Sequence, residues 1–456
     1  NTSFGHTGWT GTSIWMDPAS KSFVIILTNR NHPTEKGRTK ELRFKVATLA
    51  AQAIGLKKPE AAADSTAASA PVGAHGPKGP GKVRNGIDAL EAEPFKSLAG
   101  MRIGLVTNQT GVDAEGTSTA DLLSRAPNVR LTALFSPEHG IRGKLDTAKI
   151  SDSKDEKTGL PIFSLYGKIR KPTAEQLKGL DALVFDLQDI GCRFYTYIAT
   201  MLECMEAAAE NQISFVVLDR INPIGGKIEG PLLIGKTDFV GCHPIPVRHG
   251  MTVGELAQMF AAENKLKLNL RIIRLEGWQR SLWQDQTGLP WINPSPNMRS
   301  LTAAALYPGV GLLEFTNVSV GRGTATPFEV FGAPWIDAKK LVADLSGQEL
   351  PGIRFSETDF TPTASVFAGQ VCHGVRFVLT DRNACNSVDL GICLAAALQR
   401  NHPGTFQIDK MNRLLFHPPS LTALKAGKPP AEIVGGWADE VKAFAKRRRP
   451  FLLYGE

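Results

Sequence analysis

The sequence predicts an α/β protein with a mostly parallel sheet, followed by a smaller α+β domain. Two observations lead to this prediction. From residue 83 onward, short apolar segments alternate with amphipathic segments, which is typical of βαβ units. After about residue 325 this alternation loosens. We therefore expect one domain at residues 83–325 and a second at residues 326–456.

Each expected strand is a short run of large apolar side chains, and each expected helix has an apolar face repeated every three to four residues. The expected strands of the first domain span residues 101–107, 131–135, 182–186, 214–218 and 268–275. The helices expected between them span residues 119–125, 197–211 and 252–264. The second domain is expected to contain helices at residues 337–345 and 387–400 and a strand at residues 374–380.

The N-terminal segment forms a separate pattern. Residues 9–16 and 23–28 are rich in β-branched and aromatic side chains and are predicted strands. Residues 40–54 are predicted to form an amphipathic helix. Two strands and one helix bury too little apolar surface to be stable alone, so residues 1–57 are expected to be a fragment of a larger domain.

Residues 58–82 are dominated by alanine, proline, glycine and serine, a composition typical of a linker. Within this segment, residues 76–82 have the spacing of a phosphate-binding loop, but no predicted strand precedes them. We therefore expect no nucleotide or other cofactor.

Composition excludes several classes of protein. The chain has 456 residues, of which 42% are hydrophobic and 21% charged, as in soluble globular proteins. No apolar stretch reaches the ~20 residues that span a bilayer, so stable membrane insertion is not expected. The net charge is +8, but the one dense basic run, residues 446–449, follows a predicted helix at residues 437–445. Cations suit a helix C-terminus, so we expect a solvated helix end and no nucleic-acid partner.

Cysteine and histidine spacing predicts neither disulfides nor metal. The six cysteines form no C-x-x-C pair and are too few for a disulfide scaffold in a chain of this length, so we expect buried thiols. The histidines are not spaced as ligands on one element, and no metal site is expected.

Polar residues follow four successive predicted strands, at residues 107–111, 136–140, 186–191 and 219–223. The carboxyl ends of parallel strands meet at one edge of a sheet, where ligands bind. Carboxylates, amides and arginines at that edge predict a site for a polar ligand such as a sugar. The candidate binding residues there and in later loops are Asn108, His139, Gln188, Arg193, Tyr195, Arg220, Arg248, His249, Asn297, Asn317 and Arg322.

These residues also have structural interpretations. Asn108 alone is better explained as a helix cap or Asx turn, and Tyr195 also fits a position in the core. At least two of the four candidate arginines are expected to form ordinary ion pairs. Glu138 is harder to explain in this way, because it stands on a short glycine-ended turn with no obvious capping role. A carboxyl group buried at the sheet edge holds its proton more tightly, as a general acid requires.

A series of strings in these loops points to a known family. The strings are NGIDAL (85–90), TNQTG (107–111), SPEHG (136–140), SLYG (164–167), DLQDIGCRFYTY (186–197), LDRINP (218–223), RHGMTVGELA (248–257), PSPNM (294–298), TNVSVGRGT (316–324) and PFEVFGAPW (327–335). With them, residues 83–456 resemble the exo-β-N-acetylmuramidase family of the NamZ type.

This resemblance implies a Rossmann-like domain and a smaller C-terminal domain with a cleft between them. The implied reaction is hydrolysis of the β-1,4 bond after a non-reducing terminal N-acetylmuramic acid in peptidoglycan, with a periplasmic or extracellular location. The resemblance makes Glu138 the leading catalytic acid, and Asp186, Asp189 and Glu314 the contenders for the second carboxylate. Phe315 departs from the glycine that usually follows the position of Glu314 in the family. One of the candidate arginines is expected to bind the lactyl carboxylate.

Residues 1–57 resemble instead the C-terminal tail of a penicillin-recognising serine hydrolase. Residues 6–8, His-Thr-Gly, match an element of that group, and residues 23–30 match its next strand. The nucleophile motif Ser-x-x-Lys belongs upstream of this element, whereas the copy in this chain, residues 151–154, lies downstream. Two alternatives to the muramidase therefore stay open: a non-catalytic binding protein for muramyl sugars, and a serine acyl hydrolase or esterase based on residues 1–57.

Overall fold

The computed structural model describes residues 4–7, 13–17, 22–26, 46, 83–138, 140–141, 153–167 and 169–455. The chain divides into two compact units, residues 1–77 and 78–456. In the first unit, β1 (Phe4–Thr7), β2 (Ser13–Asp17) and β3 (Ser22–Ile26) form an antiparallel sheet in that order. The predicted strands at 9–16 and 23–28 correspond to β2 and β3. The predicted helix at 40–54, apart from residue 46, and the linker at 58–82 lie outside the described residues.

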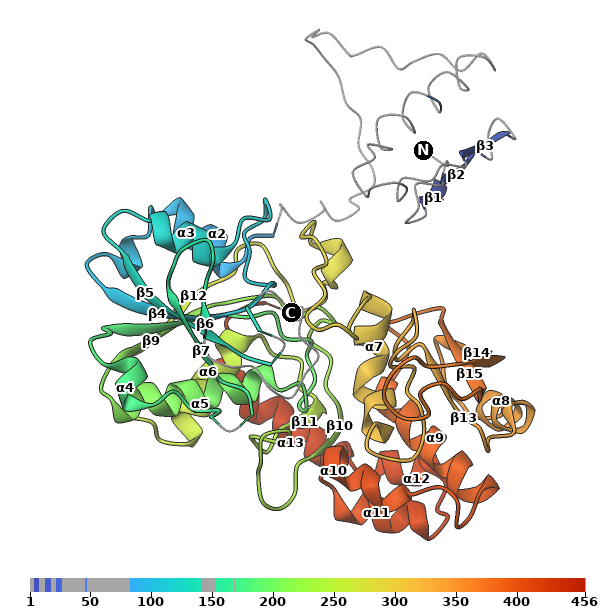
Figure 1. Cartoon of the computed structure of the whole chain (residues 1–456). Helices are drawn as coiled ribbons and strands as arrows, with labels where there is room; N and C mark the ends of the chain where they lie inside the picture. Colours follow the sequence, from blue (N-terminus) through green and yellow to red (C-terminus); the bar gives the residue numbers. More distant parts are fainter. Residues whose placement is uncertain are drawn as a thin grey trace, which may run out of the picture. The chain divides into compact units, whose positions relative to one another are not determined.

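The second unit is built on a seven-stranded sheet, which Figure 1 shows between two layers of helices. All neighbouring strands are parallel except the short edge strand β6, which is antiparallel to β7. In spatial order the strands are β12 (Leu270–Ile273), β9 (Ser214–Leu218), β8 (Ala182–Asp186), β4 (Arg102–Thr107), β5 (Arg130–Ser136), β7 (Pro161–Ser164) and β6 (Ser153–Lys154). The five predicted strands are all present, and the prediction of a mostly parallel sheet is confirmed.

Side chains alternate between the two faces of this sheet, as strand geometry requires. In β8, Leu183 and Phe185 join the core that faces α5 and α6, whereas Ala182 and Val184 face α2 and α3. The helices of this domain are α2 (Gly86–Ala92), α3 (Thr119–Arg125), α4 (Ala174–Leu177), α5 (Tyr197–Glu210) and α6 (Val253–Glu263). The three helices predicted for this domain correspond to α3, α5 and α6.

The order of the strands reverses between β4 and β8. From β4 the chain continues to β5 and β7 on one side, and then returns to β8, β9 and β12 on the other. Because the crossovers on either side of this point run over opposite faces, a crevice opens at the carboxyl ends of β4 and β8. Thr107 and Asp186, the last residues of these two strands, are paired in register there. The topology therefore places a ligand site where the polar loops were predicted to meet.

The remaining part of the second unit combines a small antiparallel sheet with helices (Figure 1). The sheet has the order β13 (Val330–Ala333), β15 (Cys372–Leu379) and β14 (Ile353–Phe360). The helices are α7 (Leu301–Val310), α8 (Ala338–Ser346), α9 (Ser387–Asn401), α10 (Asn412–Leu415), α11 (Pro418–Lys425), α12 (Pro430–Gly435) and α13 (Ala438–Arg448). The predicted helices at 337–345 and 387–400 and the strand at 374–380 correspond to α8, α9 and β15.

Helices α7 and α9 cross closely because each has a glycine at the contact. A Cβ atom on Gly309 would lie 1.6 Å from the carbonyl oxygen of Ser387, and one on Gly391 would lie 2.5 Å from that of Gly309. The other short elements are the antiparallel ribbon β10 (Glu229–Leu232) and β11 (Pro246–Arg248), and the 3₁₀ turns η1 (Lys96–Leu98), η2 (Gln284–Gln286), η3 (Gly311–Leu313), η4 (Ile408–Met411) and η5 (Arg449–Phe451).

The C-terminal segment returns to the parallel-sheet domain, and this corrects one prediction. The basic run at residues 446–449 was expected to be a solvated helix end, but α13 extends through Arg448, and this side chain is buried. Arg448 donates hydrogen bonds to the carbonyl oxygens of His249 at 3.1 Å and Gly250 at 2.8 Å. Arg447 forms an ion pair with Glu263. The run therefore ties the end of the chain to the loop that follows β11.

Among the described residues, no helix is long and apolar enough to cross a bilayer. That part of the chain also holds no group of three or more histidine, cysteine, aspartate or glutamate side chains arranged to bind a metal ion. All six cysteines are described and carry free thiols; five are buried and Cys242 is partly buried.

Candidate active site

Asp186 and Arg220 form a closed, buried ion pair at the centre of the sheet edge. The Arg220 guanidinium donates from Nε and Nη2 to the two oxygens of Asp186, at 2.5 and 2.9 Å. Thr119 Oγ1 donates to the same carboxylate at 2.5 Å, and both ends of the pair are almost fully buried. Arg220 also donates to the carbonyl of Val112. These contacts make the pair a support for the loops, which argues against Asp186 as the second carboxylate and Arg220 as a substrate ligand.

Asn108 and Gln188 brace the loops after β4 and β8. Asn108 Oδ1 accepts hydrogen bonds from the backbone N–H and the hydroxyl of Thr110, at 2.8 and 2.6 Å, which is the Asx-turn interpretation of this residue. Its Nδ2 donates to the Tyr197 hydroxyl at 2.8 Å. Gln188 is held by two donated hydrogen bonds. Its backbone N–H donates to Thr110 Oγ1, and its Nε2 donates to the Ile221 carbonyl. Both residues hold backbone that shapes the site.

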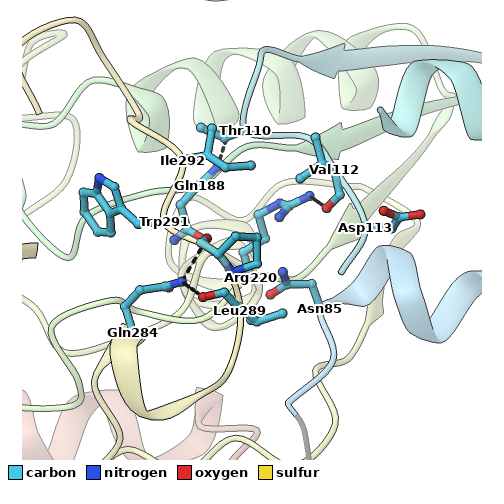
Figure 2. A pocket seen from close by; sticks show the side chains of 11 residues that line it. Asn85, Thr110, Val112, Asp113, Gln188, Arg220, Gln284, Leu289, Trp291 and Ile292 are labelled. Carbon is cyan, nitrogen blue, oxygen red and sulfur yellow. Dashed lines mark hydrogen bonds between the residues drawn. The ribbon is translucent and has the colours of Figure 1, made fainter. Parts of the chain in front are cut away.

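A small hollow lies beneath these loops, and Figure 2 shows the side chains that surround it. Arg220 and Gln188 contribute to its wall, together with Gln284, which donates to the carbonyls of Leu289 and Pro290. Its volume is about 20 Å³, which accommodates a water molecule but not a sugar ring. The hollow is therefore part of the support, and the substrate has to bind elsewhere along the sheet edge.

Glu138 lies just beyond the end of β5 and is half-buried. Thr196, at the start of α5, donates its hydroxyl hydrogen to Glu138 Oε2 at 3.1 Å. Burial raises the pKa of Tyr197 well above its usual value, and the negative charge of nearby Glu138 adds to this effect. Among the described residues, the hydroxyl of Thr196 is the hydrogen-bond partner of Glu138, and it holds one carboxylate oxygen. His139 lies outside the described residues.

Asp189 and His249 form a second buried pair. Asp189 Oδ2 accepts a hydrogen bond from the Gly191 N–H at 2.6 Å, and His249 Nε2 lies 3.4 Å from the same oxygen. His249 Nδ1 accepts from the N–H of Met251 at 3.2 Å, so a neutral His249 ring carries its proton on Nε2, facing Asp189. Asp189 Oδ1 is buried and accepts no hydrogen bond from the described residues. Of the contenders for the second carboxylate, Asp189 thus keeps an uncommitted oxygen.

Tyr195 connects these carboxylates to the second half of the unit. Burial raises the pKa of Tyr195, and the charges of Asp189 and Glu138 raise it further, whereas Arg322 opposes them. The phenol therefore stays protonated and can donate a hydrogen bond. Its ring packs edge-on against Tyr197, with centroids 5.0 Å apart, and against Tyr307 at 6.0 Å. Glu138, Asp189 and Arg322 are thus all within electrostatic range of this hydroxyl.

Glu314 and Arg322 form an ion pair beside this aromatic group. The Arg322 guanidinium also lies over the ring of Phe328, 5.8 Å from its centroid, and Phe328 packs on Tyr307. The side chain of Arg322 is 31% exposed, against 4% for Arg220 and 2% for Arg248. Arg322 is therefore the most accessible of these three candidate arginines.

Other predicted binding residues have structural contacts instead. Arg193 donates four hydrogen bonds to the carbonyls of Pro231, Ile245, Leu414 and Leu415, and burial lowers the pKa of Arg193 to about 10. Arg248 pairs with buried Glu229 at 2.5 Å. Asn317 donates to the Thr405 carbonyl and accepts from the Gln407 N–H, whereas Asn297 is buried in the loop before α7. The prediction that at least two of the four arginines form ordinary ion pairs is confirmed by Arg220 and Arg248.

Sequence reasoning missed two features of the site. Thr196, which binds Glu138, directly follows the candidate Tyr195, but a threonine before a helix is usually a cap. Tyr307 lies on α7, a helix that was not predicted, and no local signal relates it to a site more than 100 residues away.

The fold and the site together define a class: an α/β enzyme that performs acid–base chemistry on a polar ligand at the carboxyl edge of a parallel sheet. Comparison with known proteins identifies the family. Residues 103–302 match the N-terminal model, and residues 305–454 the C-terminal model, of the exo-beta-N-acetylmuramidase NamZ. The chain belongs to this family. Residues 1–48 match the beta-lactamase family model.

Individual relatives agree with this assignment. The chain is 43% identical over 379 residues to the peptidoglycan beta-N-acetylmuramidase NamZ of Bacillus subtilis (strain 168), covering 82% of this chain and 92% of that protein. Two crystal structures of DUF1343 family proteins from Bacteroides fragilis NCTC 9343 are also similar. The first is 39% identical with a TM-score of 0.72, and the match covers 83% of this chain and 100% of that structure's chain. The second is 33% identical with a TM-score of 0.68, and the match covers 82% of this chain and 100% of that structure's chain.

Proposed function

We propose that this protein is an exo-acting glycoside hydrolase that removes non-reducing terminal β-1,4-linked N-acetylmuramic acid from peptidoglycan fragments, with Glu138 as the catalytic acid. The observation that carries the proposal is the position of Glu138: a half-buried carboxyl group beyond β5, bonded to Thr196, which stands between Tyr195 and Tyr197. Family membership supports the substrate class, because the Bacillus subtilis relative is a peptidoglycan beta-N-acetylmuramidase.

The reaction needs a proton for the departing sugar oxygen and a negative charge near the anomeric carbon. The Thr196 hydroxyl holds Oε2 of Glu138, which leaves Oε1 to give a proton to the glycosidic oxygen. We propose Asp189 as the second carboxylate, because its Oδ1 is uncommitted while its Oδ2 is held by Gly191. Glu314 is compensated by Arg322, and Asp186 by Arg220, so neither offers a free negative charge.

The lactyl group distinguishes muramic acid from glucosamine by one carboxylate. Arg322 is the proposed partner of this carboxylate, because its guanidinium lies over Phe328, in the aromatic group that contains Tyr195 and Tyr307, and its side chain is 31% exposed. Guanidinium groups bind carboxylates in a forked geometry.

Release of product from a chromogenic β-N-acetylmuraminide tests the proposal, with the corresponding N-acetylglucosaminide as the control substrate. We expect selective hydrolysis of the muraminide, and a loss of about a hundredfold or more in rate for Glu138→Gln. Glu203→Gln is the matched control, because Glu203 is also a half-buried glutamate but lies on α5 away from the sheet edge. A folded wild type that binds the muraminide without releasing product would instead support the non-catalytic binding protein.

Three further parts of the proposal concern the context and the fold of the enzyme. A periplasmic or extracellular location is proposed from the substrate, since peptidoglycan lies outside the cytoplasmic membrane. Residues 1–57 are proposed to be the C-terminal end of a serine hydrolase domain, supported by the beta-lactamase match over residues 1–48. An acylating active-site probe should leave the protein unlabelled; labelling would favour the serine hydrolase alternative based on residues 1–57.

The parallel sheet is proposed to be Rossmann-like, supported by its reversal of strand order at β4 and β8.

A further inference from the structure

A second hollow, open to solvent, adjoins the proposed active site. Its volume is about 420 Å³, within the range of roughly 300–1,000 Å³ in which small ligands bind. It is lined by Gln109, Trp291, Ile292, Asn293, Ser295 and Pro296. Unlike the closed hollow beneath the loops, it is large enough for a sugar ring.

The wall of this hollow is tied directly to the residues of the site. The Tyr197 hydroxyl donates to the carbonyl of Pro294 at 2.6 Å, and Gln109 Nε2 donates to the carbonyl of Asn293 at 2.8 Å. The segment at residues 291–296 therefore forms the wall of the hollow and contacts Tyr197, whose neighbour Thr196 binds Glu138. The hollow thus lies beside the proposed active site.

Among the described residues, the lining is uncharged, and this favours a neutral sugar. These residues contribute amides, a hydroxyl, apolar side chains and one indole, but no arginine or lysine to bind a lactyl carboxylate. The Trp291 ring is oriented by a hydrogen bond from Nε1 to Asn293 Oδ1 at 3.0 Å. Figure 2 shows this ring directed away from Arg220 and Gln188, and thus away from the closed hollow. Aromatic faces pack against the C–H groups of a pyranose, while amides bind its hydroxyl and acetamido groups.

We propose that this hollow is the subsite for the neutral sugar on the leaving-group side of the cleaved bond, N-acetylglucosamine in peptidoglycan, with Trp291 as its stacking platform. The inference rests on the proposed function. An exo-acting enzyme needs an enclosed place for the terminal sugar and an open path for the rest of the chain. The hollow beside Trp291 provides the open path.

The test compares two substrates that differ only in the leaving group. N-acetyl-β-muraminyl fluoride releases fluoride and fills no leaving-group subsite, whereas the β-1,4-linked muramyl-glucosamine disaccharide fills it. For Trp291→Ala we expect kcat/KM on the disaccharide to fall about 30-fold relative to that on the fluoride, the typical effect of removing an aromatic anchor. Trp291→Phe, which keeps an aromatic face, should lose much less. The matched control is Trp335→Ala, because Trp335 is also a partly buried tryptophan on the same core but packs on His402.

The outcomes separate this inference from the proposed function. Equal losses on both substrates, or no loss on either, would overturn the subsite while leaving the muramidase activity in place. A loss as large and as selective in Trp335→Ala would also overturn it, because distant packing would then explain the effect. A folded wild type that hydrolyses neither substrate would refute the proposed function and the subsite with it.

Discussion

Replacing Asp186 with asparagine tests whether this carboxylate is structural or catalytic. Asp186→Asn keeps the shape of the side chain but removes its charge. The Arg220 guanidinium, whose side chain is only 4% exposed, then lies buried without its compensating carboxylate. The same substitution replaces one of the oxygens that accept from Arg220 and Thr119 by an NH₂ group. We therefore expect a large loss of stability.

The magnitude follows from the burial of the pair. Removing one partner of a buried ion pair costs about 3–5 kcal/mol, because the remaining charge is uncompensated. Domains are stable by only about 5–15 kcal/mol, so this loss is a third or more of a typical total. With urea m-values of about 1–3 kcal/mol per molar, the unfolding midpoint of Asp186→Asn should fall by about 1–3 M.

Urea unfolding followed by tryptophan fluorescence measures this shift, and muraminide hydrolysis is measured on the same samples. Asp189→Asn is the matched comparison: Asp189 has an uncommitted oxygen, so its variant should unfold within about 1 M of the wild type but lose at least tenfold in rate. If Asp186→Asn kept the wild-type midpoint and lost its activity, the assignment of Asp186 to structural support would be wrong.

Three further predictions concern buried or ion-paired groups. Burial raises the pKa of Asp219 to about 7. The stability that this carboxyl group contributes is therefore complete below about pH 4 and is lost as the pH rises through 7. The urea midpoints at pH 5 and pH 8 should differ less in Asp219→Asn than in the wild type. Arg193→Met leaves four carbonyls without donors and should lower the urea midpoint while sparing the rate per folded molecule; an unchanged midpoint would contradict this. Arg322→Gln should raise KM for the muraminide about tenfold or more, whereas Glu314→Gln should change kcat less than about threefold; the reverse pattern would make Glu314 the second carboxylate.

The sheet was predictable because its strands are buried on both faces. Such strands appear as continuous apolar runs, and the predicted ranges 182–186 and 214–218 coincide with β8 and β9. Strand β7 (Pro161–Ser164) was missed because it is only four residues long and mostly half-buried. Helix α7 was missed because it is apolar on all sides and contains Pro308, so it has neither an amphipathic pattern nor an uninterrupted helical sequence. Strand order also could not be predicted, since it depends on contacts between distant segments.

The location of the site was predictable for a topological reason. Parallel strands put all their carboxyl ends at one edge, so polar residues after β4, β5, β8 and β9 had to converge. The role of each residue was not predictable in the same way. Arginines predicted to bind the substrate, such as Arg193, are bonded to backbone carbonyls up to 222 residues away. Sequence patterns give the residue types at the edge, but the partners come from the tertiary fold.

The carboxylates at this edge are of similar residue type but differ in their bonding partners. Asp186 is compensated by a guanidinium from the loop after β9, and Asp219 is bonded by the hydroxyl of Tyr454, 235 residues later in the chain. Both are fully committed to holding loops in place. Glu138 has a neutral hydroxyl as its partner and remains half-exposed, so it can exchange a proton with a ligand. A rigid, fully paired support beneath the proposed acid suits acid catalysis, because the acid must be fixed in position without being neutralised.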